Sequence, residues 1–214
     1  EIGPQQTLYM PGCWLKKGKN EIIILDYVGP QKNSLAGLLV PKLDELTSNA
    51  KNEKSRKEGQ TLEMATVSPL YEGAFKDGIE WQTVKFKSTN GRYLCIEALN
   101  SQKNADPYTT IAELYLLDKN GKELPRNKWK VLYADSEEMD GDDGKAANVF
   151  DLQSTSIWHT QWNNKAPKHP HQLVIDLGET VSTSGLKYLP RQDGPNGRIK
   201  DFKLYLSPKN FPGL

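Results

Sequence analysis

The feature that most constrains the fold is a series of short segments that alternate between apolar and polar residues or are rich in β-branched and aromatic ones. Each segment is bounded by Gly, Pro, Asn or Asp, which is typical of strands separated by turns. The predicted strands are Thr7–Met10, Glu21–Tyr27, Thr83–Phe86, Tyr93–Ala98, Thr110–Leu117, Lys130–Tyr133, Gln172–Leu177, Ser184–Leu189 and Phe202–Leu206. Strands of this length and spacing favour an all-β sandwich, and Lys42–Ala50 is suited to a short helix.

The charge of the chain is nearly balanced, with 28 basic and 27 acidic residues. A nucleic-acid-binding domain would need a basic excess, so we expect no nucleic-acid partner. No apolar run approaches the roughly 20 residues of a membrane span, so we expect no membrane partner. Cys13 and Cys95 lack metal-ligand spacing, and two buried free thiols are favoured over a disulfide between them.

The polar and charged stretch Pro41–Gln60 is the best candidate for a domain boundary. Two predicted strands precede it, and two strands alone are marginally stable in water. We therefore expect residues 1–46 to be the end of a preceding domain plus a linker, and residues 47–214 to be a separate β-sandwich. The chain begins with Glu1 and not with Met, so we expect a piece of a longer protein.

The sequence carries no pattern that predicts catalysis. Glycoside hydrolysis needs two carboxylates roughly 5–9.5 Å apart. Glu137 and Glu138 are adjacent after a predicted strand, so we expect them to point to opposite sides or into solvent. Glu80 and Glu113 have no evident partner, and there is no Gly-x-Ser-x-Gly elbow, phosphate loop or HExxH motif. We expect this chain to bind a ligand without catalysing a reaction.

An oxygen-rich loop in the last third of the chain is a candidate cation site. It contains Asn148, Asp151 and Ser156, and Ca²⁺ takes roughly six to eight oxygen ligands. The alternative is an Asx-turn in which Asp151 caps the local backbone. The acidic run Asp140–Gly144 lacks EF-hand spacing and is interpreted as a solvated turn.

A cluster of aromatic and polar residues follows this loop. His159 and Trp162 are three positions apart on a predicted loop, so both can point into one pocket, while Trp158 alternates with the core. A later loop between two predicted strands carries Arg and Asn. A sugar ring needs a flat aromatic surface with planar or forked hydrogen-bonding groups. The combination favours a carbohydrate-binding module over an enzyme.

A resemblance to a known family concerns the start of the chain. The segment Gly3–Asp26 resembles the closing segment of the jelly-roll domain in family 35 β-galactosidases. This resemblance implies a parent protein that is a β-galactosidase-like glycoside hydrolase, with its catalytic domain upstream. It also implies a periplasmic or extracellular location.

A second resemblance covers most of the remaining chain. Residues 130–207 resemble the first half of a discoidin (F5/8 type C) domain, and above all its family 32 carbohydrate-binding members. The matching segments are Ala147–Asp151, Trp158–Trp162, Val174–Gly178 and Gly185–Ser207. Segments that resemble the second half come earlier in the chain, and they are Gly73–Phe86, Gly91–Ala98 and Thr110–Tyr115.

We therefore predict a circularly permuted discoidin domain with the galactose-binding-like jelly-roll fold. In this prediction Leu116–Asn127 bridges the former termini, because domain termini often lie close together. The alternative is two separate discoidin domains that are each cut in half, which would leave sheet edges exposed.

The discoidin resemblance also implies the residues of two sites. The implied Ca²⁺ ligands are Asn148, Asp151, Ser156, Ala112 and Glu113. Gln153 replaces the Asn or Asp that the family often has in that loop. The implied galactose-binding residues are His159, Trp162, Arg191, Asn196 and Tyr108.

Other interpretations of single residues stay open. Arg191 could instead pair with Asp193 or Asp201, and Arg198 competes for its role. His169 and His171 have His-x-His spacing but no evident third metal ligand.

The sequence as a whole predicts a non-catalytic accessory domain that binds a galactose-containing glycan. The alternatives are a purely structural sandwich that braces the parent enzyme, and a lipid- or protein-binding discoidin domain. Lipid binders expose apolar residues on long loops, whereas the loops of this chain are polar.

Overall fold

The computed structural model describes residues 61–103 and 105–214, which belong to one compact unit that spans Lys57–Leu214. The predictions that fall outside the described residues are the strands Thr7–Met10 and Glu21–Tyr27, the helix Lys42–Ala50, Cys13, the boundary at residue 46 and the β-galactosidase-like segment Gly3–Asp26.

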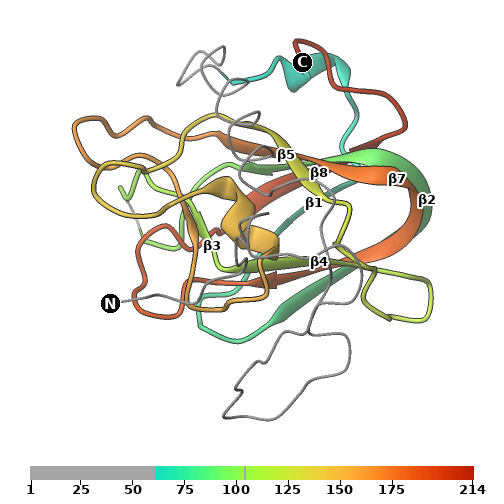
Figure 1. The fold of residues 1–214 in the computed structure, drawn as a ribbon, viewed down its shortest axis with the longest axis horizontal. Coiled ribbons are helices and arrows are strands. Elements are labelled where there is room, and N and C mark those ends of the chain that lie inside the picture. Colours follow the sequence, from blue (N-terminus) through green and yellow to red (C-terminus); the bar gives the residue numbers. More distant parts are fainter. Residues whose placement is uncertain (1–60, 104) are drawn as a thin grey trace, which may run out of the picture. The chain divides into compact units, whose positions relative to one another are not determined.

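The described residues form eight strands and two short 3-10 helices (Figure 1). The strands are β1 (Tyr71–Ala74), β2 (Gln82–Ala98), β3 (Thr110–Ile111), β4 (Glu113–Leu117), β5 (Lys130–Ala134), β6 (Trp158–His159), β7 (His171–Leu189) and β8 (Asp201–Ser207). The 3-10 helices are η2 (Met64–Thr66) and η3 (Ala146–Phe150). The predicted all-β class is confirmed, and no helix in this part of the chain could cross a membrane.

Early and late strands of the chain alternate in the main sheet. Its order is β1–β8–β2–β7–β4, and β5 also pairs with β7. The pairs are antiparallel, and Figure 1 shows the green strand β2 between the red β8 and the orange β7. The alternative of two separate half domains is therefore wrong, because the segments on either side of residue 120 build one sheet.

Strands β2 and β7 are longer than predicted. Thr83–Phe86 and Tyr93–Ala98 are joined in β2, and Gln172–Leu177 and Ser184–Leu189 are joined in β7. Figure 1 shows the two strands curving together around one end of the sandwich. Register shifts in their pairing mark this bend. On one side of the bend, the last part of β2 pairs with β8 and the first part of β7 pairs with β5. On the other side, the last part of β7 pairs with β4.

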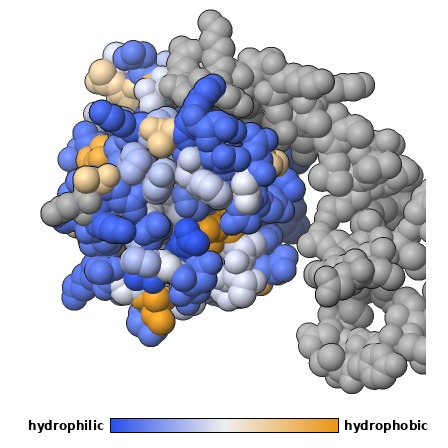
Figure 2. Space-filling view, turned by 90° about the vertical axis from the view of Figure 1, so that its left-hand side faces the viewer, coloured by the Kyte–Doolittle hydropathy of each residue, from blue (hydrophilic) through white to orange (hydrophobic). Residues whose placement is uncertain are grey.

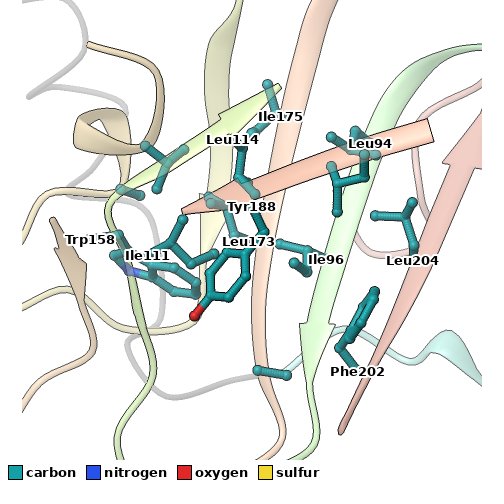
Figure 3. Packing of buried hydrophobic residues seen from close by; sticks show 14 of the residues in the cluster. Leu94, Ile96, Ile111, Leu114, Trp158, Leu173, Ile175, Tyr188, Phe202 and Leu204 are labelled. Atoms are coloured by element: carbon teal, nitrogen blue, oxygen red, sulfur yellow. The ribbon is translucent and has the colours of Figure 1, made fainter. Parts of the chain in front are cut away.

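The core lies between the two layers that these strands form. Side chains of β2, β4, β7 and β8 meet there (Figure 3). Phe75 stacks between Tyr188 and Phe202, with ring centroids 4.2 and 4.1 Å away, and Trp158 is fully buried, as its alternation predicts. Cys95 is a buried free thiol, and burial raises the pKa of this thiol well above its usual range.

Candidate functional site

A pocket of about 260 Å³ lies among the loops next to β3 and β6. Its lining residues are Tyr108, Asp142, His159, Trp162, Arg191 and Asn196. The structure thus brings together all five residues of the predicted sugar site, although they come from three separate parts of the chain. The volume is below the roughly 300–1,000 Å³ of pockets for drug-sized ligands, which suits a ligand as small as one sugar ring.

Aromatic rings form one wall of the pocket. The ring centroid of His159 lies 5.5 Å from that of Tyr108 and 6.5 Å from that of Trp162. Trp162 is 41% exposed while Trp158 is 0% exposed, so only the first of these two indoles can serve as a binding surface. The prediction placed His159 on a loop, and this was wrong. His159 lies on β6, where it pairs with Thr110 of β3.

The His159 ring presents a hydrogen-bond acceptor to a ligand. Its Nδ1 lies 2.6 Å from the carbonyl oxygen of Thr160, and a carbonyl only accepts, so Nδ1 carries the proton. Burial lowers the pKa of His159. The hydrogen bond to Thr160 raises this pKa and the nearby Arg191 cation lowers it, and the net shift is downward. The ring is therefore neutral at pH 7, and its Nε2 can accept a hydrogen bond from a hydroxyl group.

Arg191 is held in place by a carboxylate. Its Nε and Nη2 donate to the two carboxylate oxygens of Asp193 at 2.5 and 3.2 Å, as one of the alternative interpretations predicted. Asp201 is not its partner, because that carboxylate accepts from the Asn100 amide at 2.7 Å. Arg198 contacts the Arg191 carbonyl and does not line the pocket.

Asn196 belongs to a tight loop that packs on β3. Its backbone carbonyl accepts a hydrogen bond from Thr110 Oγ1 at 3.1 Å, and its side-chain oxygen accepts one from Lys103 at 3.4 Å. The next residue, Gly197, has a φ of 74°, and a Cβ there would lie 2.7 Å from the Thr110 methyl group. Glycine is therefore required for this loop to place Asn196 at the pocket.

The acidic run is a solvated bend, as predicted, because Asp140, Gly141, Asp142 and Asp143 are all exposed. Asp142 in addition lines the pocket. This run packs directly against Trp162, since a Cβ on Gly141 would lie 2.6 Å from the Trp162 ring. Glycine at this position inside an acidic run was the sequence signal for such a close approach.

Glu138 fixes the acidic run to the Trp162 loop. Of the two orientations expected for Glu137 and Glu138, opposite sides or solvent, the solvent one is wrong for Glu138. Its side chain is fully buried. One carboxylate oxygen accepts from the backbone N–H groups of Asp140 and Gly141 at 3.0 and 2.8 Å. The other accepts from those of Trp162 and Asn163 at 2.8 and 2.7 Å. Burial alone would raise the pKa of Glu138, but these four hydrogen bonds outweigh it and lower the pKa to about 2.

The predicted calcium loop is closed by its own hydrogen bonds. One oxygen of Asp151 accepts from the Gln153 amide at 2.8 Å, and the other from Ser156 Oγ at 2.7 Å. The Asn148 side chain donates to the carbonyl oxygen of Ile157 at 3.0 Å. This pattern agrees with the Asx-turn interpretation. The Asn148 backbone carbonyl accepts from the Asp151 amide at 3.4 Å, which leaves its second lone pair and the outer carboxylate lone pairs for a cation.

Glu113 faces this loop from β4. It is 3% exposed, and one of its oxygens accepts a hydrogen bond from Arg126, which also donates to the Leu114 carbonyl at 2.8 Å. Its Oε1 is buried without a hydrogen-bond partner. Burial raises the pKa of Glu113, Arg126 lowers it and Asp151 raises it, so the two carboxylates are within electrostatic reach of each other.

Some of these contacts favour the predicted calcium site and others disfavour it. A buried, unpartnered carboxylate oxygen next to a second carboxylate is what a hard cation would satisfy. Ala112 of the predicted set is fully buried beside Glu113. Arg126, which sequence reasoning missed, already supplies one positive charge to Glu113. No group of three or more His, Cys, Asp or Glu side chains suited to a metal occurs among the described residues, so backbone carbonyls would have to complete the set.

The His-x-His pair is engaged by the protein. The two ring nitrogens of His171 lie 2.7 Å from the Asp135 carboxylate and 2.7 Å from the Pro107 carbonyl. His169 Nε2 lies 3.1 Å from Thr109 Oγ1. Both rings thus brace the chain that leads to Tyr108.

Comparison with known proteins agrees with the fold. Residues 133–211 match the family model of the F5/8 type C domain. The chain is 34% identical over 143 residues to a sialidase from Micromonospora viridifaciens, covering 66% of this chain and 21% of that protein. It is 39% identical over 89 residues to a galactose oxidase from Gibberella zeae, covering 41% of this chain and 12% of that protein.

A third relative is the A type blood N-acetyl-alpha-D-galactosamine deacetylase from Flavonifractor plautii, which is 37% identical over 65 residues. These residues are 29% of this chain and 8% of that protein. The chain therefore spans about a fifth or less of the length of the curated relatives it matches.

Proposed function

We propose that this chain is a non-catalytic carbohydrate-binding region that takes a galactose-type sugar in the pocket around Trp162. The observation that carries the proposal is the convergence of five residues, chosen for sugar binding, on one small pocket. Its relatives named above include a galactose oxidase and an enzyme that acts on N-acetyl-galactosamine, which agrees with a galactose-type ligand.

Each side chain of the pocket contacts a different part of the sugar. The exposed face of Trp162 packs on the apolar face of the sugar ring. His159 Nε2 accepts a hydrogen bond from one hydroxyl, and the Arg191 guanidinium, oriented by Asp193, donates to another. The Asn196 amide both donates and accepts, and Tyr108 covers the edge of the ring. An axial hydroxyl beside an apolar face, as in galactose, fits such a set.

We also propose that the domain is a circularly permuted discoidin domain of a β-galactosidase-like hydrolase. The shared sheet supports the permutation, because strands that resemble the second half of a discoidin domain pair with strands that resemble the first half. The resemblance of Gly3–Asp26 supports the parent enzyme. Bound to a glycan, the region would raise the local substrate concentration for an upstream catalytic domain.

We propose, third, that a structural Ca²⁺ binds between Asp151 and Glu113. The unpartnered Oε1 of Glu113 supports this site. The Asn148 carbonyl, the Ser156 hydroxyl and the backbone of Ala112 would supply further oxygen ligands. The ion would fix the loop that precedes β6, and β6 carries His159.

The purely structural alternative is disfavoured by Trp162. A bracing domain has no need for an indole that is 41% exposed beside a histidine, an arginine and an asparagine. The lipid-binding alternative is disfavoured by the surface, because the face in Figure 2 is mostly hydrophilic with hydrophobic residues in small, separate groups.

Calorimetric titration of the 214-residue chain with galactose and lactose in the presence of Ca²⁺ tests the proposal. We expect a Kd on the order of 0.1–1 mM, because few ligand atoms are buried. Trp162→Ala and Arg191→Ala should each weaken binding at least tenfold. Trp81→Ala is the matched control, since Trp81 is also 41% exposed but lies outside the pocket. No response of the wild-type chain to either sugar would show that this is not a galactose-binding module.

A further inference from the structure

The charge balance of the pocket points beyond a neutral sugar. Two of its lining residues are charged, Asp142 and Arg191. The charge of Arg191 is matched by Asp193, which it contacts through two nitrogens. His159 also lines the pocket, and burial together with the nearby Arg191 cation lowers the pKa of its ring, so this ring is neutral at pH 7.

Two further charged residues, Lys103 and Asp106, contact residues of the pocket. Lys103 rests on the Asn196 side chain at 3.4 Å. The Asp106 carboxylate accepts from the backbone N–H groups of Tyr108 and Gly197 at 3.1 and 2.8 Å. Of the two charged residues that line the pocket, Arg191 is paired with Asp193, and Asp142 is the one without an ion pair among the described residues.

Asp142 has no partner that would neutralise it. Within the described part of the chain, its carboxylate accepts a hydrogen bond from the adjacent amide of Asp143 at 2.8 Å and forms no ion pair. Asp143, by contrast, pairs with Lys145 at 3.1 Å. A carboxylate at a pocket wall without a cation is available to a positively charged ligand group.

The position of Asp142 relative to the sugar platform is fixed by the fold. Glu138 binds the backbone just before Asp142 and the backbone of Trp162 through the same carboxylate. Gly141 lies against the Trp162 indole with no room for a side chain. A sugar stacked on Trp162 therefore has Asp142 beside it.

We propose that Asp142 is a specificity-determining residue that makes the pocket prefer protonated amino sugars of the galactose type and disfavour uronic acids. The inference rests on the proposed function, because it assumes that a galactose-type ring stacks on Trp162. The ammonium group of galactosamine gains a charge-assisted hydrogen bond to Asp142, while the carboxylate of galacturonic acid is repelled by it. Exposed ion pairs of this kind change binding by roughly two- to fivefold.

The test is a calorimetric or NMR titration at about pH 6 and low salt, where carboxylates are ionised and the sugar amine is protonated. Galactose, galactosamine, N-acetylgalactosamine and galacturonic acid are compared. We expect galactosamine to bind roughly three- to fivefold tighter than galactose, galacturonic acid to bind more weakly, and added salt to shrink both differences. N-acetylgalactosamine carries a neutral substituent at the same carbon and should show no gain.

Asp142→Asn keeps the shape of the side chain and removes its charge, so the variant should bind the three unacetylated sugars with equal affinity. Asp143→Asn, one residue along the same loop, should leave the ranking unchanged. Equal affinity of the wild-type chain for galactose and galactosamine would overturn the inference and leave the proposed function standing, as would a preference that persists in Asp142→Asn. Binding of none of the four sugars would overturn the proposed function itself, and the inference with it.

Discussion

Replacing Glu138 with Gln should destabilise the whole pocket region, although it replaces only one carboxylate oxygen with an NH₂ group. The Glu138 carboxylate accepts four backbone N–H groups, two on each oxygen. A glutamine has one oxygen and one NH₂ group. Whichever way the amide turns, its NH₂ group faces two N–H donors and leaves both without an acceptor in a buried site.

The magnitude follows from the pKa of the carboxyl group. Lowering it from the ordinary value of 4.5 to about 2 corresponds to about 3 kcal/mol of folding stability at neutral pH. Two lost hydrogen bonds to a charged group give a similar figure, at about 1.5–3 kcal/mol each. We therefore expect Glu138→Gln to lower the free energy of unfolding by about 3 kcal/mol.

Urea unfolding followed by tryptophan fluorescence measures this difference. Because the folded-state pKa of Glu138 is lowered, its contribution is complete above about pH 4.5 and is lost as the pH falls toward 2. The difference between wild type and variant should be constant from pH 5 to 8 and shrink in acid. The neighbouring Glu137, whose carboxylate accepts from the Ala146 amide at 2.6 Å, supplies the control Glu137→Gln with a smaller loss. A loss below about 1 kcal/mol for Glu138→Gln at pH 7 would refute the reasoning.

Three further outcomes are expected from the contacts of single residues. Gly141→Ala should weaken galactose binding several-fold with little loss of stability, because a Cβ there meets the Trp162 ring at 2.6 Å; unchanged affinity in a titration would contradict this. Tyr188→Phe should cost about 1–2 kcal/mol in urea unfolding, because its buried hydroxyl accepts from the Ile199 amide at 3.1 Å. EDTA should lower the Tm of the wild-type chain but not that of Glu113→Gln, and an equal Tm with and without EDTA in the wild type would argue against the Ca²⁺ site.

The strands could be predicted where they alternate, but their joining could not. Thr83–Phe86 has a half-buried face and Tyr93–Ala98 a buried one, whereas the residues between them are polar or glycine and show no such alternation. Those residues are strand because their backbone pairs with β7 across the bend, and a tertiary pairing of this kind leaves no period in the sequence. The same holds for β6, a strand of two residues that pairs with β3.

The five predicted sugar-site residues, which line one pocket, could be named from the sequence because the resemblance to the discoidin family implies them. Asp142 and Glu138 could not, because their roles depend on the contacts of Gly141 and Glu138 with Trp162, which is more than 20 positions away. Arg126 was missed for the same reason, since only the fold brings it to Glu113. Acidic residues before a turn are usually solvated, and burial of Glu138 is tolerable only because four backbone N–H groups meet there.

The central claim is that one sugar site is assembled from segments that lie far apart in the sequence. An NMR titration of the ¹⁵N-labelled chain with galactose, in the presence of Ca²⁺, tests it most directly. We predict that the amide signals of Tyr108, of His159 and Trp162, and of Arg191 and Asn196 shift together along one binding curve. Shifts confined to only one of these segments, or no shifts in this pocket at millimolar galactose, would contradict the account.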